Sequence, residues 1–266
     1  MTATQETSST PTDQPEVLVT AEDGVMVITI NRPTAKNAVT LAVSEGVAAA
    51  LDELDARDDL AVGVITGAGG TFCAGMDLKG FLRGERPSLP GRGFAGITMA
   101  PPAKPMIAAV EGYALAGGCE IVLACDMVTA GRGAKLGIPE AKRGLVAAAG
   151  GLMRLPERIP PNVAMELALT GDFLDAPRAA AIGLVNRLVD DGEALAAALD
   201  LARAIATNGP LATRASKQVI VESRGWPLAE RWERQASIIE PVFASEDAQE
   251  GARAFAEKRA PQWQGR

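Results

Sequence analysis

No histidine occurs in this sequence of 266 residues. Its absence excludes Ser-His-Asp and Cys-His catalysis, and it excludes every zinc or iron site that depends on an imidazole ligand. Acid–base chemistry near neutral pH must therefore use carboxyl groups with displaced pKa values, or the side chains of Lys, Tyr or Cys.

Cysteine is scarce as well, and the three that occur, Cys73, Cys119 and Cys125, show no paired metal-ligand spacing. All three stand among small or apolar neighbours, which indicates reduced, buried thiols that serve as small core residues. Such thiols are typical of a reducing compartment. The sequence therefore predicts a cytoplasmic protein without a metal site.

The chain also lacks long hydrophobic runs and an excess of positive charge. No apolar stretch approaches the roughly 20 residues that cross a bilayer, and residues 1–15, polar and rich in Thr and Ser, do not resemble a secretory signal. We expect a disordered tail there and no membrane contact. The formal net charge of −7 argues against a broad nucleic-acid surface, although a few local cations suffice for a small anionic ligand.

The sequence does contain enough apolar material for a large core, with 47% hydrophobic and 22% charged residues. Apolar, β-rich runs predict strands, and apolar residues at helical spacing after Thr40 predict a helix between the second and third strands. Strand, helix, strand in this order indicates a partly parallel sheet. The predicted strands are residues 17–20, 25–30, 62–66, 106–110, 127–130 and 184–189.

The pattern changes to helices in the last part of the chain. Long helical runs are predicted over residues 193–207, 211–223, 228–243 and 247–258. We therefore divide the chain into a β/α core over 16–195 and a C-terminal helical region over 196–266.

Two glycine-rich loops follow buried strands and open helices: TFCAGMDLKG, residues 71–80, and YALAGGCE, residues 113–120. Glycine lets the backbone approach a ligand closely, and free N–H groups at a helix start attract negative charge. If both loops face one cleft, the amides of Met76 and Gly117 can hold one developing oxyanion; otherwise the glycines serve only as tight connections. The Gly-, Pro- and Arg-rich segment 79–96 is either a variable loop or a lid.

Glu120 and Glu140 form the candidate acid–base pair. Glu120 stands in an apolar stretch directly after two glycines, and Glu140 follows an intervening strand that can return the chain to the same region. Two carboxyl groups in one dry site cannot both stay ionised cheaply, so one holds a proton while the other accepts one. Taken separately, each has a plainer explanation, as a charge at a helix N-terminus or a surface glutamate after a turn.

Six segments together resemble the enoyl-CoA hydratase/isomerase (crotonase) family over about residues 17–263. They stand in the family's order at compatible spacing, so the resemblance is highly specific. The segments are ITINRPTAKNAV, GAGGTFCAGMDL, KPMIAAVEGYALAGGCEIVLACD, AKLGIPEAKRGLVAAAGGLMRL, AMELALTGDFLDAPRAAAIGLVNRLV and AFAEKRAPQW.

The resemblance implies an α/β fold, a crotonase-like spiral of ββα units, with a helical C-terminal region that forms a homotrimer or a homohexamer of two trimers. It implies a lyase that adds water reversibly, with syn stereochemistry, to trans-2-enoyl-CoA in fatty-acid or acyl-CoA metabolism. Coenzyme A enters as part of the substrate and no other cofactor is implied. The alternatives are a carnitinyl-CoA dehydratase-like or isomerase activity on another acyl-CoA; the retained glutamates and acidic charge disfavour a non-catalytic RNA-binding or scaffold relative.

By the same resemblance, the amides of Met76 and Gly117 form the oxyanion hole. Glu120 is the base that takes a proton from water as its oxygen attacks C3, and Glu140 is the acid that protonates C2. The residues implied to bind the acyl-CoA are Ala35, Lys36, Ala74, Gly75, Asp77, Leu78, Gly118, Phe255 and Lys258. In related trimers the last two positions reach an adjoining subunit's nucleotide; otherwise the phenylalanine is a core residue and the lysine a solvated charge.

Some positions depart from the family pattern. Met76 stands where hydratases commonly have alanine, but a backbone donor survives this change and the side chain then shapes the acyl pocket. Ala147 stands where proline is frequent, and Glu111 stands where asparagine is common. Glu111 is either a third titratable group near the site or a paired structural carboxylate. Lys142 and Arg143 are expected at the surface or in an interface.

Overall fold

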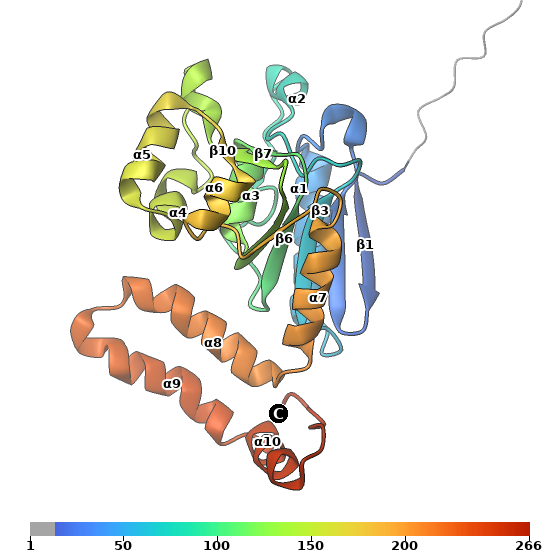
Figure 1. The fold of residues 1–266 in the computed structure, drawn as a ribbon, viewed down its shortest axis with the longest axis vertical. Coiled ribbons are helices and arrows are strands. Elements are labelled where there is room, and N and C mark those ends of the chain that lie inside the picture. The colour runs from blue at the N-terminus through green and yellow to red at the C-terminus, as the bar shows by residue number, and fades with distance from the viewer. Residues whose placement is uncertain (1–13) are drawn as a thin grey trace, which may run out of the picture.

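The computed structural model describes residues 14–266, so the predicted tail over residues 1–15 lies almost entirely outside the described chain. A six-stranded sheet forms its centre, in the order β1 (Val17–Glu22), β2 (Val25–Ile30), β3 (Val62–Gly67), β6 (Met106–Val110), β8 (Met127–Gly131) and β11 (Arg187–Val189) (Figure 1). β1 pairs antiparallel with β2, and all other neighbours pair parallel. The predicted partly parallel sheet is confirmed, although its last strand is shorter than expected.

The first hairpin turns at Asp23 and Gly24, which both adopt positive φ angles of 49° and 78°. Two such residues between paired Glu22 and Val25 form the tight turn whose twist matches that of antiparallel strands. A second sheet, in the order β10 (Leu174–Asp175), β9 (Lys135–Gly137) and β7 (Tyr113–Leu115), lies beside the first.

Helices connect the strands and extend beyond them. They are α1 (Leu41–Ala56), α2 (Leu78–Leu82), α3 (Gly117–Ala124), α4 (Gly151–Arg158), α5 (Pro161–Thr170), α6 (Ala176–Ala181), α7 (Ala194–Ala206), α8 (Pro210–Glu222), α9 (Arg231–Phe243) and α10 (Glu246–Glu257). Short 3-10 turns are η1 (Pro33–Ala35), η2 (Pro139–Arg143), η3 (Ser223–Gly225) and η4 (Leu228–Glu230). The predicted cap of α1 is confirmed, because the Thr40 hydroxyl accepts a hydrogen bond from Val43 N at 3.1 Å.

Alternate residues of the central strands face two hydrophobic layers, as the period of two in a strand requires. Val64 and Ile107 pack with Ala202 of α7 on one face. Their neighbours Ile65 and Ala108 lie in the main core, to which α1 and α3 contribute. α7 therefore completes the core, and the helices that stand apart from it begin with α8.

The segment 79–96 is ordered in the structure. It contains the end of α2 and the short hairpin of β4 (Ser88–Leu89) and β5 (Gly93–Phe94), and its residues Phe81, Ser88 and Phe94 line a cavity. The segment thus forms part of the wall of that cavity.

The C-terminal helices α8, α9 and α10 lie below the sheet in Figure 1. α9 contains no buried residue, and α8 buries only Ala215. α8 is attached to the core through Lys217, whose ammonium pairs with Asp126 at 2.7 Å and donates to the Lys104 carbonyl at 2.9 Å. None of the described helices is long and apolar enough to cross a membrane.

Candidate active site

The two glycine-rich loops lie against each other. The amide of Leu115 donates to the Cys73 carbonyl at 3.0 Å, and the amide of Cys73 donates to the Tyr113 carbonyl at 2.8 Å. Gly75 has a φ of 101°, and a methyl group built on it would lie only 3.4 Å from the nitrogen of Gly117. Backbone hydrogen bonds therefore hold the loop of Met76 against the loop of Gly117, so both loops can face one cleft.

The amides of Met76 and Gly117 are free to bind a ligand. Bonds from Val39 N to Gly75 O at 2.8 Å and from Asp77 N to Val39 O at 3.0 Å flank Met76 and leave its own N–H unused. Gly117 is the first residue of α3, where an N–H has no acceptor within the helix. Over residues 14–266 neither amide donates a hydrogen bond, and both residues line the cavity.

Residues 117 and 118 have no room for a side chain. A methyl group on Gly117 would lie 2.4 Å from the ring of Phe94, and one on Gly118 would lie 2.1 Å from the Cys73 carbonyl oxygen. Ala116 before them adopts a φ of 52°, which is uncommon for a residue with a side chain. Its amide donates to the Gly137 carbonyl at 2.9 Å. This bond and the packing fix the direction of the Gly117 amide.

Glu120 lies in the first turn of α3 and is 3% exposed. Its Oε1 accepts hydrogen bonds from Ala149 N at 2.7 Å and Gly151 N at 2.9 Å, at the start of α4. Burial raises the pKa of Glu120, and these two amides together with the positive charge of Arg154 oppose part of that rise. The hydrogen bonds from the two amides partly compensate the cost of burying the Glu120 carboxylate in this apolar stretch.

Glu140 lies in η2 and lines the same cavity. Its Oε2 is buried and has no hydrogen-bond partner in the described chain. Burial raises the pKa of Glu140 and the negative charge of Glu120 raises it further, while its own backbone amide and the positive charge of Arg143 oppose part of that rise. The two carboxyl groups have unlike surroundings, because two amides of another segment hold Glu120 whereas one oxygen of Glu140 has no partner in the described chain.

The cavity has a volume of about 960 Å³. Its wall is mostly apolar, and its apolar side chains include Leu78, Phe81, Phe94, Met99, Leu115, Leu145, Val146, Met153 and Phe173. Among residues 14–266 no group of three Cys, Asp or Glu side chains is arranged to hold a metal ion. Seven of the residues predicted from the sequence line the cavity: Lys36, Ala74, Met76, Leu78, Gly117, Glu120 and Glu140.

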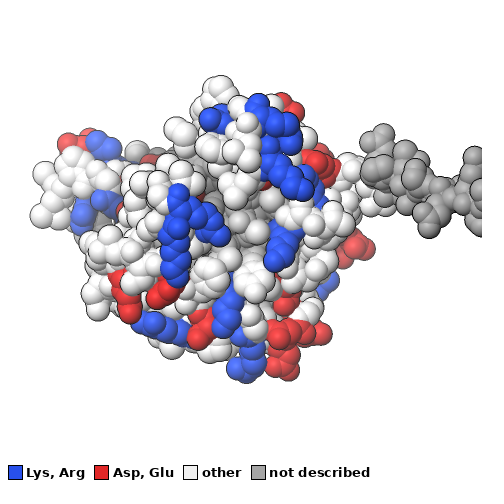
Figure 2. Space-filling model, turned by 90° about the horizontal axis from the view of Figure 1, so that it is seen from above, with Lys and Arg blue, Asp and Glu red and all other residues white. Residues whose placement is uncertain are grey.

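Positively charged side chains line the cavity although the chain as a whole is acidic. Lys36, Arg143 and Arg154 line it, and Figure 2 shows Lys and Arg side chains gathered around the hollow of this face. Lys36 has a left-handed backbone, and its ammonium lies 5.5 Å from the ring centroid of Tyr113. Its carbonyl accepts from Ala74 N at 3.0 Å, which joins the turn at η1 to the loop that carries Met76. Ala35 precedes it in η1.

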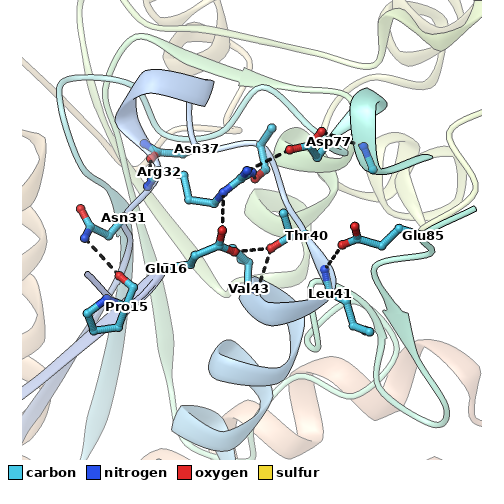
Figure 3. Close-up of polar contacts among 12 residues, drawn as sticks. Pro15, Glu16, Asn31, Arg32, Asn37, Thr40, Leu41, Val43, Asp77 and Glu85 are labelled. Carbon is cyan, nitrogen blue, oxygen red and sulfur yellow. Dashed lines mark hydrogen bonds and ion pairs between the residues drawn. The ribbon is translucent and has the colours of Figure 1, made fainter. Parts of the chain in front are cut away.

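Asp77 lies outside the cavity lining, and its carboxylate has structural partners (Figure 3). One oxygen accepts from the amides of Lys79 and Gly80 at 2.9 and 3.0 Å and so caps α2. The other pairs at 2.9 Å with Arg32, whose guanidinium also pairs with Glu16 at 2.9 Å. Hydrogen bonds, the Gly80 amide first, lower the pKa of Asp77. This network holds the Met76 loop in place.

The structure places three charged positions that the sequence left open, and two of them have partners. Glu111 accepts from Gly192 N at 3.0 Å and Ala194 N at 2.9 Å at the start of α7, which confirms the structural alternative. Lys142 pairs with Asp172 at 2.6 Å at the surface, whereas Arg143 lines the cavity.

Phe255 and Lys258 lie on and just after α10, away from the cavity of the same chain (Figure 1). Phe255 is 87% exposed, so it is not a core residue of this chain. Lys258 has a left-handed backbone and ends α10. Within one chain these two residues therefore do not meet the other predicted site residues.

Sequence reasoning missed Phe94 and Arg154. Arg154 is half-buried, lines the cavity and donates from Nη2 to the Thr98 carbonyl at 2.6 Å. Its position in the GGLMRL segment was part of the family resemblance, but no local pattern distinguishes it from a solvated arginine. Phe94 fell in the segment whose glycines and prolines indicated a loop.

This apolar cavity contains two carboxyl groups, one of them with a buried oxygen that has no partner in the described chain, and two free main-chain donors. Such a site is suited to acid–base chemistry on a carbonyl compound. An enzyme of this class needs neither histidine nor a metal ion for its proton transfers.

The comparisons with known proteins define the family. The sequence profile of the enoyl-CoA hydratase/isomerase family matches residues 20–266, and the chain belongs to this family. It is 42% identical over 263 residues to enoyl-CoA hydratase EchA19 of Mycobacterium tuberculosis, which covers 95% of this chain and 97% of that protein. It is 40% identical over 259 residues to a carnitinyl-CoA dehydratase of Salmonella typhi, with 93% and 98% coverage.

A solved structure agrees with this assignment. A crystal structure of an enoyl-CoA hydratase from Mycobacterium tuberculosis is 59% identical and superposes with a TM-score of 0.94 over 95% of this chain and 100% of that chain. The predicted crotonase fold, with its α/β spiral and C-terminal helices, is therefore confirmed, as is the prediction of an enzyme of this family.

Proposed function

We propose that this protein is an enoyl-CoA hydratase that adds water reversibly to the C2–C3 double bond of a trans-2-enoyl-CoA. The observation that carries the proposal is the joint presence of Glu120 and Glu140 in a cavity that also contains the free amides of Met76 and Gly117. Relatives named as enoyl-CoA hydratases support the choice of substrate.

The amides of Met76 and Gly117 bind the thioester oxygen and stabilise the negative charge that it gains when C3 is attacked. Their position on two loops joined by backbone hydrogen bonds means that the donors need no rearrangement during the reaction. Because Gly117 and Glu120 share the first turn of α3, one rigid element holds a donor and a carboxyl group together.

The unlike surroundings of the two carboxyl groups support different roles. Two amides and a nearby guanidinium favour ionised Glu120, which takes the proton of the attacking water. One buried oxygen of Glu140 has no hydrogen-bond partner in the described chain, and the group faces the charge of Glu120, so Glu140 holds the proton that it gives to C2. Addition of hydroxyl and hydrogen from this pair on one face gives syn hydration.

The test is loss of the absorbance of the conjugated thioester when the protein is mixed with crotonyl-CoA, compared between wild type and Glu120→Gln. Rapid loss with the wild type and slow loss with the variant would support the proposal. No loss with either protein, for enoyl chains of several lengths, would reject hydration of this class of ester.

A second candidate is dehydration of a carnitinyl-CoA, which the similarity to carnitinyl-CoA dehydratases favours. The trimethylammonium group of that substrate is cationic, and the cavity already contains the cations Lys36, Arg143 and Arg154. Like charges oppose each other in an apolar site, so we rank this candidate second. Assay of crotonobetainyl-CoA beside crotonyl-CoA distinguishes the two.

The proposal includes assembly as a homotrimer, or as a hexamer of two trimers, through the C-terminal helices. Large apolar side chains exposed there support it, with Trp232 at 80% and Phe243 at 77% exposure. In such an assembly Phe255 and Lys258 would bind the nucleotide of an adjoining subunit's substrate. Gly75 and Gly118 would support substrate binding by letting the two glycine-rich loops approach each other. Asp77 would support it by holding the loop of Met76 in place.

We also retain a cytoplasmic location and a role in fatty-acid β-oxidation as parts of the proposal. The three cysteines are unpaired and buried, which agrees with a reducing compartment. Reduced thiols do not identify the metabolic pathway. The length of the acyl chain that the enzyme prefers would narrow the choice of pathway.

A further inference from the structure

Part of the cavity wall consists of large apolar side chains that remain exposed to solvent. Met99 and Met153 are each 71% exposed, Val146 is 68%, Phe173 is 49% and Leu145 is 43% exposed, and all five line the cavity. Single exposed apolar residues are ordinary in proteins, but a set that lines one cavity marks a binding surface. We call these five residues the apolar rim.

Three residues of the apolar rim lie on or close to the elements that position the carboxyl groups. Leu145 and Val146 follow η2, which carries Glu140, after one glycine, and Met153 lies on α4, whose first amide, that of Gly151, holds Glu120. The cation Lys36 is instead joined to the loop of Met76 through Ala74. A thioester bound between the two amides can therefore direct its coenzyme toward Lys36 and its acyl chain past the glutamates to the apolar rim.

Resting on the hydratase function proposed above, we propose that the apolar rim makes this enzyme selective for enoyl-CoA esters with long apolar acyl chains of about eight carbons or more. A crotonyl group has only one carbon beyond C3 and ends near the carboxyl groups. A longer chain continues along the rim and removes both surfaces from water. Each methylene so buried raises kcat/KM by a factor of about two to four.

Methionine suits this use. Its unbranched, polarizable side chain adapts to ligands of different shape, and Met99 and Met153 face the cavity from separate segments. Arg154, the charged neighbour of Met153, is directed to the Thr98 carbonyl at 2.6 Å and so belongs to the wall that supports the rim.

The experiment measures kcat/KM for trans-2-enoyl-CoA esters of four, eight and twelve carbons, below the concentrations at which the long esters form micelles. The proteins are wild type, Val146→Thr and Met153→Gln. Met165→Gln is the matched control, because Met165 is a methionine of α5 that is 59% exposed and does not line the cavity.

We expect wild-type kcat/KM to rise by at least about tenfold from four to twelve carbons. Val146→Thr and Met153→Gln should lose about two- to fivefold in kcat/KM with the twelve-carbon ester and a smaller factor with crotonyl-CoA, whose acyl group ends before the rim. Met165→Gln should change neither value. A wild-type preference for crotonyl-CoA, or equal effects of Met153→Gln and Met165→Gln, would overturn the inference while leaving the hydratase function intact. A rim variant that changes only the molecular mass in solution would overturn it in favour of a contact between subunits. If no ester is hydrated, the proposed function fails and the inference with it.

Discussion

The α/β core and the C-terminal helices use apolar side chains in opposite ways. In the core, every residue of β6 is buried, and so are the first five residues of β3. In the C-terminal region α9 buries none of its residues, and Trp232 and Phe243 on it are 80% and 77% exposed. Both regions consist of regular elements, so the difference lies in what covers their apolar faces.

This difference separates two requirements of the protein. The core brings together the amides, the carboxyl groups and the cavity wall within one chain. The C-terminal helices expose more apolar surface than a region without partners ordinarily does, which is the basis of the proposed assembly. Variants of the core should therefore affect chemistry and leave assembly intact, and variants of α9 should affect assembly first.

The largest effect is expected from Glu120→Gln. Loss of the base should lower kcat with crotonyl-CoA by about 10²- to 10⁴-fold. Burial raises the pKa of Glu120, so its ionised form costs stability at pH values above that pKa, and the neutral glutamine removes this cost. The melting temperature at pH 8 should therefore stay the same or rise, and the molecular mass in solution should not change.

Glu111→Gln is the matched control for this variant, because Glu111 accepts from backbone amides as Glu120 does but lies outside the cavity lining. Its activity should stay within twofold of wild type. Equal losses of activity in the two variants would contradict the assignment of the base.

Gly117→Ala should give the next largest effect. The added methyl group would lie 2.4 Å from the ring of Phe94, so the backbone or the ring must shift and the amide loses its direction. Loss of one oxyanion donor lowers kcat by about 10²- to 10³-fold. The control is Gly225→Ala, where the added methyl group meets nothing within 4 Å. Steady-state kinetics on both variants check the prediction, and a fully active Gly117→Ala would refute a role for this amide.

The variant Trp232→Asp tests the role of the C-terminal helices in assembly. A charge at the centre of an apolar contact should weaken the proposed assembly by at least about tenfold, because a buried unpaired charge is costly. Light scattering should show three or six chains of 27.5 kDa for the wild type and a smaller mass for the variant. Leu169→Asp, at a leucine of α5 that is 72% exposed, should leave the mass unchanged. A wild-type protein that is monomeric at micromolar concentration contradicts the proposed assembly.

The smallest effect on activity is expected from removing the positive charge of Arg154 near Glu120. The positive charge of Arg154 lowers the pKa of Glu120, so Arg154→Met should raise that pKa. Because the base must be ionised, the acidic limb of the profile of kcat/KM against pH should move to higher pH. The rate should fall severalfold on the acidic side and little on the basic side. Arg154→Lys, which keeps the charge, should restore the wild-type limb; a limb that is identical in all three proteins would contradict this link.

Much of the fold could be predicted from local patterns, because the central strands are continuous apolar runs and Thr40 caps α1 as its sequence indicates. β7 lies within residues 113–120, for which the sequence predicts a glycine-rich loop, because a strand of three residues beside glycines is too short to give a pattern. α4 was missed because it begins at two glycines and contains Pro156, which are signals of irregular chain.

The site could be predicted where a chemical reason is local and could not where it is tertiary. Glu120 stood out as a charge in an apolar stretch, and the family resemblance paired it with Glu140. Arg154 has no such local signal, because its partner carbonyl, that of Thr98, lies 56 residues away in the sequence. For α9 the sequence showed a helix, but a helical pattern does not say whether its apolar face is covered by the same chain or by another copy.

The central claim is that one thioester oxygen meets two main-chain donors while two carboxyl groups stand beside C2 and C3. A crystal structure of the protein with a bound 3-hydroxyacyl-CoA product tests it most directly. We predict the thioester oxygen about 2.7–3.1 Å from the nitrogens of both Met76 and Gly117, and the 3-hydroxyl group within hydrogen-bond distance of the carboxyl groups of both Glu120 and Glu140. A thioester oxygen bound elsewhere, or a hydroxyl group out of reach of either glutamate, would contradict the claim.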